Sequence, residues 1–516
     1  MRNETSDKKE FVLPAKNTVQ LEQGGGNIFF ESGGEFVLPD YMPKVQKVLR
    51  MEARALPPSR YMGSGEAQMS GSVLHTLIYV GEEGEVSATV LPAKYEFSIP
   101  FTAGGELPTV SAAVEVDSLS YRLGAPRKLN IRTRLRAKPR VITTEDIAEK
   151  QLPGGEIAGL HTLGGEIDSI RTQILRSPDI TVSDAVDIGG GADTRPIWCG
   201  STAAVSDVRV VDGGVSVRGE AYVKVLLDDG GKPKMVAKKL PFEEFLDGDV
   251  AKGSSATATA RVISTEAGKE QEGEALIDVV LVVEAAVDTP SRTPAVKDAF
   301  SELSEGQVEY RKVPTARLLC NRSGVYTVGG SVTKAAAGAA GLSTVLDTSG
   351  EATVEEAALA DGRLTISGRC ALNTIYTAAE GETAAAEYTV PFKVTVDCET
   401  PIGAEANVSV SLVSARTRPD GENLVCDMDI AVSARAVARG EAVTVESIDF
   451  TAPKVYTKSA YPLCLIYPRG DSLWNLAKKY HVSPETLAKI NALSINEENY
   501  ANAEALADIN VLMLEL

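Results

Sequence analysis

Histidine is the side chain best suited to acid–base chemistry near neutral pH, and the sequence contains three, His75, His161 and His481. A catalytic histidine needs a nucleophile or an acid within hydrogen-bond reach. His75 falls on the inward face of a predicted strand, His161 lies in a glycine-rich segment with no implied partner, and His481 follows a predicted helix. These settings predict a buried structural role for His75, and no catalytic residue is identified.

Phosphate-binding chemistry is disfavoured by the glycine-rich runs. Gly24–Gly26 and Gly189–Gly191 lack the Lys-Ser/Thr pair of a phosphate-binding loop. Gly230-Gly231-Lys232 is followed by Pro233 and lies in a predicted hairpin. We therefore interpret all three runs as turns, and the sequence predicts no nucleotide and no other cofactor.

Metal chemistry is disfavoured as well. The carboxylates of Asp228-Asp229 and Glu82-Glu83 mark the same turn in two related segments, which favours solvation; calcium binding is the alternative, but the EF-hand spacing is missing. Six cysteines show no metal-ligand spacing: Cys199, Cys320, Cys370, Cys398, Cys426 and Cys464. We expect reduced and mostly buried thiols, with late oxidative cross-linking as the alternative. No metal site is predicted.

A stretch near the end of the chain has the spacing of a small helical module. Three side chains recur at helical spacing: Leu473, Ala477 and Tyr480. Ser483 is suited to cap a second helix that begins at Pro484. Asn491 is suited to end that helix in the left-handed region. The predicted order is strand, helix, short turn, helix and a closing strand at Asn510–Leu516.

The run Gly470-Asp471-Ser472-Leu473-Trp474, with the tyrosine, the Ser-Pro-Glu and the asparagine that follow, resembles the LysM domain, a βααβ module. Members commonly bind N-acetylglucosamine polymers in a groove between the loop after the first strand and the loop after the second helix. The resemblance implies that these loops are Gly470, Asp471, Ser472, Leu473, Asn491, Ala492, Leu493 and Ser494. The sequence departs from the family beyond this point, because residues 494–508 form a longer acidic insert at one wall of the groove.

The rest of the chain contains an internal repeat. Gly71, Gly219 and Gly368 are 148 and 149 residues apart, and each follows a small residue–glycine pair at the same distance. A Pro-Phe pair follows each of these key glycines: Pro100-Phe101, Pro241-Phe242 and Pro391-Phe392. Three such coincidences in register indicate a threefold internal repeat.

Each repeat carries the pattern of half-buried strands. Apolar and polar residues alternate along Val215–Leu227 and again along Leu364–Leu372. An Asp-Gly pair before the strand supplies the positive φ of a hairpin turn. The key glycine lies in mid-strand on the inward face, which indicates a bulge or a close backbone approach. The fold predicted is mainly β, with three tandem β-sandwich-like repeats followed by a small βααβ domain.

The predicted boundaries follow from these patterns. In chain order they are an N-terminal arm over 1–40, the first repeat over 41–145, the second over 185–290, the third over 300–450 and the C-terminal module over 461–516. Residues 141–185 have no strong periodicity and are expected to be a linker. We expect a short helix opening at Pro43, and a second one around Ala295–Leu303 that leads into the third repeat.

Charge and hydropathy limit the partners. The net charge of −19 disfavours nucleic acid and anionic membranes. The most apolar run, Ala275–Val287, contains two acidic residues and is too short to span a bilayer. Because the N-terminal residues have no apolar core of a signal peptide, we expect a cytoplasmic protein without a transmembrane segment.

One dense basic patch stands out in this acidic chain. It comprises Arg122, Arg127, Lys128, Arg132, Arg134, Arg136, Lys138 and Arg140. A solvated strand face is one interpretation. The other is a docking face for an acidic partner, such as a second copy of the chain.

The repeats also resemble a family. Glu35–Pro43 followed by Val45–Arg50, together with the glycine–strand–turn–Pro-Phe unit, is similar to the SPOCS domain of endospore formers. Tandem SPOCS repeats that end in one LysM domain resemble the SipL and SpoVID type of spore coat morphogenetic protein. The resemblance covers nearly the whole chain.

The resemblance implies a structural role rather than an enzyme. Such proteins act in the mother cell at the forespore surface, where they bind the self-assembling ATPase of the coat basement layer and other coat proteins, with LysM among the docking surfaces. A second hypothesis is a carbohydrate-binding protein that uses its LysM domain on peptidoglycan. A saturable sugar site would distinguish the second from the first.

Overall fold

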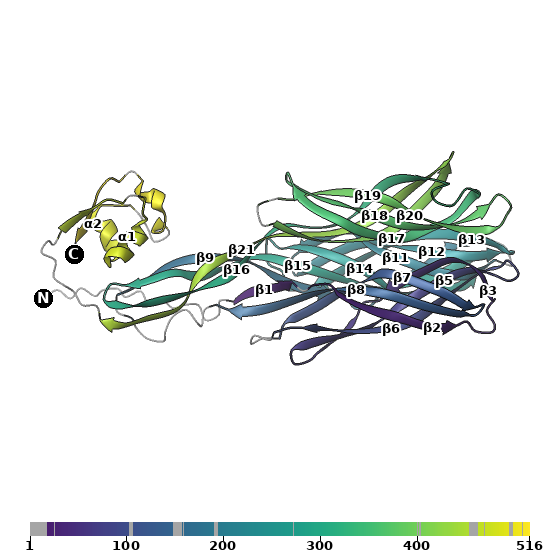
Figure 1. Cartoon of the computed structure of the whole chain (residues 1–516), viewed down its shortest axis with the longest axis horizontal. Helices are drawn as coiled ribbons and strands as arrows, with labels where there is room; N and C mark the ends of the chain where they lie inside the picture. The colour runs from purple at the N-terminus through teal and green to yellow at the C-terminus, as the bar shows by residue number, and fades with distance from the viewer. Residues whose placement is uncertain are drawn as a thin grey trace.

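The structure is a computed structural model of the 516-residue chain. It describes residues 18–24, 26–102, 107–147, 157, 159–189, 194–271, 273–399, 401, 404–453, 463–468, 470–494, 499–507 and 509–515. A body of layered β-sheets occupies one end of an elongated molecule, a narrow β-stalk leaves it, and a small helical module lies at the far end of the stalk (Figure 1). Among the described residues, no helix has the length and apolar character needed to cross a bilayer.

Strands make up almost all of the described chain. The first repeat contains β1 (Thr18–Gly24), β2 (Ile28–Val37), β3 (Val45–Ala55), β4 (Ser59–Met62), β5 (Glu66–Gly81), β6 (Val86–Pro100), β7 (Thr109–Ala125) and β8 (Lys128–Asp146). The second contains β9 (Leu160–Arg176), β10 (Ile180–Asp187), β11 (Thr194–Val211), β12 (Gly214–Asp229), β13 (Lys232–Asp247), β14 (Ser255–Gln271) and β15 (Glu274–Ser301). The third contains β16 (Ser304–Thr333), β17 (Leu342–Ala360), β18 (Arg363–Ala378), β19 (Thr383–Asp397), β20 (Ala404–Asp420) and β21 (Asn423–Pro453). The module contains β22 (Leu463–Ile466), α1 (Leu473–Tyr480), α2 (Pro484–Ile490), the 3-10 helix η2 (Ala503–Leu506) and β23 (Leu512–Glu515).

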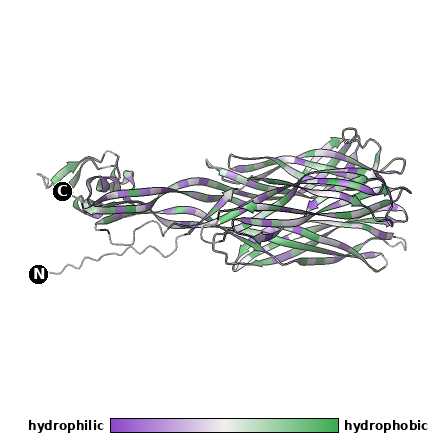
Figure 2. Ribbon diagram, turned by 60° about the horizontal axis from the view of Figure 1, so that its bottom comes forward, coloured by the Kyte–Doolittle hydropathy of each residue, from purple (hydrophilic) through white to green (hydrophobic). Residues whose placement is uncertain are grey.

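Each repeat consists of two antiparallel sheets, so the prediction of a mainly β fold is confirmed. One sheet contains the central hairpin. Its strand order is β3-β5-β6 in the first repeat, where β4 also pairs with β5; it is β11-β12-β13 in the second repeat and β17-β18-β19 in the third. The other sheet pairs the first strand of the repeat with the last. Its strand order is β1-β8-β2 in the first repeat, where β7 also pairs with β8; it is β10-β15-β14 in the second, where β9 also pairs with β15, and β16-β21-β20 in the third. In the second repeat Val217 and Phe242 of one sheet share a core with Ile277 of the other. Apolar and polar residues alternate along these strands in the body and in the stalk (Figure 2).

The key glycines lie where a side chain has no room. Gly219 pairs across the sheet with Phe242, and Gly368 pairs with Phe392. A β-carbon at either glycine would collide with the ring opposite and with a backbone carbonyl oxygen of the neighbouring strand. That neighbouring strand has a bulge at the same level in both repeats. The expectation of a close approach beside a bulge is therefore confirmed.

The first repeat corrects the predicted Pro-Phe equivalence. Gly71 pairs with Tyr95, whose ring takes the place of the phenylalanine, whereas Pro100 pairs with Glu66. The Pro-Phe pair of this repeat therefore lies at the open end of the β5–β6 hairpin and does not face the key glycine. A two-residue motif is too short to fix strand register, which is set here by the continuous ladder between β5 and β6.

The expected arm, linker and helices are also corrected, because all of them contain strands. β1 and β2 lie in the described part of the predicted arm, whose residues 1–17 are outside the described residues, and β9 and β10 overlap the described part of the predicted linker. β3 lies where Pro43 suggested a helix. Ala295, Val296, Ala299 and Phe300 are buried in β15, not in a helix. A bulge between Val296 and Asp298 shifts the alternation by one residue, and this shift imitates helical spacing. The other boundaries stay a prediction.

The three repeats close into a ring. β6 contacts β11, β13 contacts β17, and β19 contacts β3, so the same surface of each repeat meets the next, and the third returns to the first. Ile78, Leu226 and Ile375, which have the same spacing as the key glycines, meet in one buried cluster at the centre. The body therefore has approximate threefold symmetry, and its three repeats share one buried cluster.

A buried ionic group joins the repeats beside this cluster. Arg50 of β3 donates hydrogen bonds to the carboxylate of Asp347 in β17 and, at 3.0 Å, to the side-chain oxygen of Asn373 in β18. Lys224 of β12 approaches the same carboxylate to 2.8 Å. Burial raises the pKa of Asp347, but the charges of Arg50 and Lys224 outweigh this effect and hold the pKa below its usual value. One carboxylate thus connects all three repeats.

The stalk begins where the outer sheets of the three repeats meet. Asp288 of β15 is fully buried, and Arg435 of β21 donates a hydrogen bond of 2.7 Å to it and one of 2.8 Å to Glu22 of β1. Arg140 of β8 donates a bond of 2.8 Å to the same Glu22. A cavity of about 190 Å³ lies beside this network. Beyond it the paired strands β9–β15 and β16–β21 continue toward the module (Figure 1).

Candidate functional site

The C-terminal module contains two short helices whose N-termini are capped by serines, and the cap at Ser483 is the one that the sequence predicts. The hydroxyl of Ser472 accepts a hydrogen bond of 3.2 Å from the backbone N–H of Asn475 and caps α1. The hydroxyl of Ser483 accepts one of 3.1 Å from Thr486, with Pro484 at the first position of α2. These caps satisfy backbone donors that have no partner within a helix.

The end of α2 differs from the expectation. Asn491 has a φ of −96°, and the left-handed conformation is taken by the next residue, Ala492, with a φ of 51°. The Asn491 side chain is engaged elsewhere, because its amide nitrogen donates bonds of 2.8 Å to the carbonyls of Leu487 and Met513, and its oxygen accepts one of 2.6 Å from the Met513 N–H. Asn491 therefore fastens β23 to α2.

The predicted groove residues divide into two groups. Leu473 and Ser472 are buried, and Leu493 packs against the same hydrophobic cluster as Leu473. Exposed positions remain at Gly470, Ala492 and Ser494, while Asp471 and Asn491 are half-buried. The structure thus brings the two loops onto one core, but it turns several of their side chains inward or into internal hydrogen bonds. The assignment of these loops as a ligand groove stays a prediction.

The insert after the second helix completes the core of the module. Tyr500 and Leu506 are buried in it, and η2 lies within the insert. The carbonyl of Tyr500 accepts a hydrogen bond of 2.8 Å from the backbone N–H of Trp474. The insert therefore lies against the start of α1, directly beside the first predicted loop.

The stalk tip forms part of the module's core, which the sequence did not indicate. The indole N–H of Trp474 donates a bond of 2.8 Å to Asp298, and Lys478 lies 2.7 Å from the same carboxylate. Phe300 packs edge-on against Trp474, with ring centroids 5.0 Å apart. Burial raises the pKa of Asp298, but hydrogen bonds from Lys478, Tyr310 and Trp474 outweigh it and lower the pKa overall. One face of α1 is thus fixed to the stalk.

Two of the three histidines also lie at this contact. His161 stacks on Phe300 and bonds to Glu302 at 2.5 Å. A ring nitrogen of His481 lies 3.3 Å from the carbonyl of Ser301. Both rings therefore serve the junction between stalk and module.

His75 has the structural role that the sequence predicts. It is completely buried; Nδ1 donates to the carbonyl of Leu91 at 3.0 Å, and Nε2 accepts from the hydroxyl of Thr133 at 2.7 Å. Burial lowers its pKa, and the bond to Leu91 opposes this only in part. The ring is therefore neutral in the folded state.

This geometry predicts a pH-dependent stability of the first repeat. Because the pKa of His75 is lowered on folding, the unfolded chain binds more protons than the folded chain below the ordinary histidine pKa of about 6.5, so stability falls as the pH falls, by at most about 1.4 kcal/mol per pH unit. The double variant His75→Leu/Thr133→Val removes both polar partners and should flatten this dependence. Urea unfolding between pH 7 and pH 5 measures it; an unchanged slope in the variant would contradict the assignment.

The basic patch is largely neutralised within the first repeat. Arg136 and Lys138 both lie 3.0 Å from Glu115, and Lys128 lies 2.8 Å from Glu35. These ion pairs favour the interpretation as a solvated strand face, because little uncompensated positive charge is left to attract an acidic partner.

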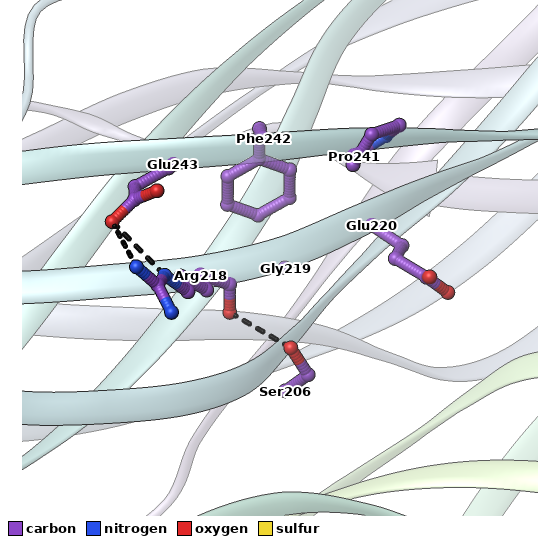
Figure 3. A pocket seen from close by; sticks show the side chains of 7 residues that line it. All are labelled: Ser206, Arg218, Gly219, Glu220, Pro241, Phe242 and Glu243. Atoms are coloured by element: carbon purple, nitrogen blue, oxygen red, sulfur yellow. Dashed lines mark hydrogen bonds and ion pairs between the residues drawn. The ribbon is translucent and has the colours of Figure 1, made fainter.

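A hollow of about 390 Å³ lies on the surface of the second repeat (Figure 3). It lies over Gly219. Arg218 pairs with Glu243 at 2.9 Å, and the Ser206 hydroxyl donates to the Arg218 carbonyl at 3.2 Å. Among the described contacts of the three histidines, none is to this hydroxyl, so it lacks the histidine partner of an activated serine.

The cysteine thiols and the possible metal ligands of the described residues bear on the same question of reactivity. All six cysteines are free thiols. Burial raises the pKa of Cys199 and of Cys370 to about 12, which disfavours the reactive thiolate. Within the described part of the chain, no three side chains of histidine, cysteine, aspartate or glutamate are grouped to hold a metal ion.

Comparison with protein families identifies two domains. Residues 342–417 match the family described as SipL, SPOCS domain, and residues 469–499 match the LysM domain. The first match begins at β17 and ends within β20 of the third repeat, and the second contains α1 and α2. No curated protein and no solved structure matches the chain significantly. The two domain families are non-catalytic, and together they fit a scaffold of the sporulation coat or a peptidoglycan-binding protein.

Proposed function

We propose that this chain, which carries a SPOCS domain and a C-terminal LysM domain, is a non-enzymatic scaffold of spore coat assembly. It acts at the forespore surface in the mother cell and binds the ATPase of the coat basement layer, with the LysM module as the main docking surface. The first two repeats are further SPOCS domains that bind other coat proteins.

One observation carries the proposal: the LysM module is held at the end of a β-stalk that grows out of a closed three-repeat body. Trp474 and Lys478 of the module share the Asp298 carboxylate of the stalk. A module fixed in this way is presented far from the body (Figure 1). This arrangement suits a protein that connects two layers.

The module's interior favours a protein ligand over a sugar. Sugar recognition relies on polar groups that are free to bond hydroxyls. Ser472 caps a helix and Asn491 holds β23, so both side chains are already committed. The insert that buries Tyr500 adds a wall beside the first loop. The exposed Ala492 and Ser494 keep peptidoglycan binding as the second candidate.

The test compares the full chain with a chain that lacks residues 461–516. Binding to the purified basement-layer ATPase, followed by biolayer interferometry, should be lost on deletion, because the module supplies the docking surface. The deletion uncovers Phe300 at the stalk tip, so Phe300→Ser is added to the truncated chain as a control. Undiminished binding by the truncated chain would refute the proposal.

Sedimentation of the full chain with insoluble peptidoglycan tests the second candidate. Ser494→Trp is the matched variant, because Ser494 is exposed and a large ring there obstructs the predicted groove without entering the core. Leu473 is unsuitable for this purpose, since it is fully buried. Saturable binding that Ser494→Trp abolishes would replace the coat scaffold by a wall-binding protein.

A further inference from the structure

We propose that the outer edge of β22 accepts an extended, apolar segment of the protein partner as a third strand of the LysM sheet. This inference deepens the proposed function and rests on it, since it assigns the docking surface to one edge and one face of the module. It does not use the loops of the predicted sugar groove.

The two edges of this sheet differ. The sheet contains only β22 and β23, paired antiparallel from Leu463–Glu515 to Ile466–Leu512. The outer edge of β23 is closed by the side chain of Asn491, which bonds both the N–H and the carbonyl of Met513. A side-chain amide there takes the place that a neighbouring strand would otherwise take.

The same bonds define the direction of the backbone groups on β22. Opposite residues of an antiparallel pair direct their N–H and carbonyl groups either toward each other or both outward. Met513 directs its groups outward to Asn491, so its partner Leu465 also directs its own groups outward, on the opposite side of the sheet. Leu463, two residues earlier, does the same. No described strand pairs with this edge.

The outer face of the sheet is apolar. Leu465 and Tyr467 are each 62% exposed, and Leu463 is 54% exposed. Met513 of β23 and Val511, which precedes β23, are each 39% exposed. Five large, largely apolar side chains are thus exposed on or directly beside a four-residue ladder. An exposed apolar surface beside an open edge is the combination that β-augmentation uses.

Length and charge identify the occupant. The ladder of β22 is four residues long, so the edge accommodates a segment of about four to five residues. Two copies of so short an edge bury little area, and each chain carries a net charge of −19, which opposes self-association. The occupant is therefore a segment of a different protein, extended, apolar at alternate positions and flanked by basic residues.

Two other surfaces of the module are already engaged. Trp474 and Lys478 fix α1 to the stalk, and Asn491 closes the second edge. Within the described part of the sheet, the edge of β22 is where an incoming backbone finds groups that no strand pairs with.

Amide hydrogen exchange of the full chain tests the proposal, with the purified basement-layer ATPase as the probe. In the free chain the Leu465 amide should exchange rapidly; in the saturated complex a peptide that spans 463–467 should be protected by about tenfold or more, as a new ladder bond requires. Unchanged exchange at this edge in a saturated complex would overturn the inference while leaving the proposed function intact.

Substitutions at one position separate the backbone from the side chain. Leu465→Pro removes the outward N–H; because this N–H takes no part in the ladder between β22 and β23, the ladder stays intact. Leu465→Ala keeps the N–H and removes only apolar surface. We expect Leu465→Pro to weaken ATPase binding by about tenfold or more relative to Leu465→Ala. Equal affinities of the two variants would overturn the inference.

The remaining outcomes are equally decisive. If the free chain forms dimers and Leu465 is already protected in them, the occupant is a second copy and the inference is wrong. If the full chain does not bind the ATPase at all, the proposed function fails, and the inference fails with it. Protection of α1 peptides in each variant, compared with the wild type, confirms that the module stays folded and docked.

Discussion

Replacing Asp347 by alanine is expected to lower the free energy of unfolding of the three-repeat body by about 3–5 kcal/mol. The side chain of Asp347 is 5% exposed, and the change leaves Arg50 and Lys224 without their shared carboxylate in a buried setting. An uncompensated buried charge costs far more than the loss of an exposed ion pair. Guanidinium unfolding followed by circular dichroism measures the difference.

Two comparisons test the reason for this loss. Asp397→Ala removes a carboxylate that is 97% exposed and should change stability by less than about 1 kcal/mol. Replacing Arg50, Lys224 and Asp347 together, as in Arg50→Met/Lys224→Met/Asp347→Leu, should restore most of the stability, because both cations and their shared carboxylate are removed and Glu52, the other charged neighbour of Arg50, is 37% exposed. A triple variant as unstable as Asp347→Ala would show that packing, not charge, is responsible.

The second large effect is expected at the stalk tip. Phe300→Ala should weaken the docking of the module by about 3–5 kcal/mol, because Phe300 is 3% exposed and shares a core with Trp474 and Leu473. The emission of Trp474 should shift to longer wavelength as the ring becomes solvated. A Trp198→Phe background isolates this signal, since the chain has only two tryptophans.

Phe245→Ala is the matched control for this change. Phe245 is 51% exposed on the second repeat, so its removal should leave the Trp474 emission unchanged. An unshifted spectrum in Phe300→Ala would mean that the module holds Trp474 buried without the stalk. In that case the module folds independently of the rest of the chain.

Periodicity predicted the features that depend on neighbouring residues. The alternation along Val215–Leu227 gave the central strands, and the spacing of Gly71, Gly219 and Gly368 gave the number of repeats. The cap at Ser483 could be predicted because a helix cap involves residues only three positions apart, and Ser472, which the structure adds, caps α1 in the same way. These local rules account for most of the mainly β fold and for the helices of the module.

The remaining features of the fold depend on contacts between residues that are far apart in the sequence, and local patterns could not predict them. β2 has its ladder with β8, about a hundred residues later in the chain, so nothing near β2 in the sequence indicates a strand rather than an arm. The bulge after Val296 imitated a helix by shifting the alternation. Asp298 and Trp474 are 176 residues apart, and no pattern in either segment indicates that they bond. Only the fold brings such pairs together.

The closed ring of repeats has a consequence for how the protein is made. Arg50 meets Asp347 across 297 residues, so the first repeat lacks its neighbour on one side until most of the chain has been synthesised. Folding that depends on such distant contacts is slow. A nascent or truncated chain without the third repeat leaves Ile78 and Leu226 without their third partner and exposes an apolar surface. The ring is thus complete only in chains that have been translated through the third repeat, and shorter products remain open to chaperones and proteases.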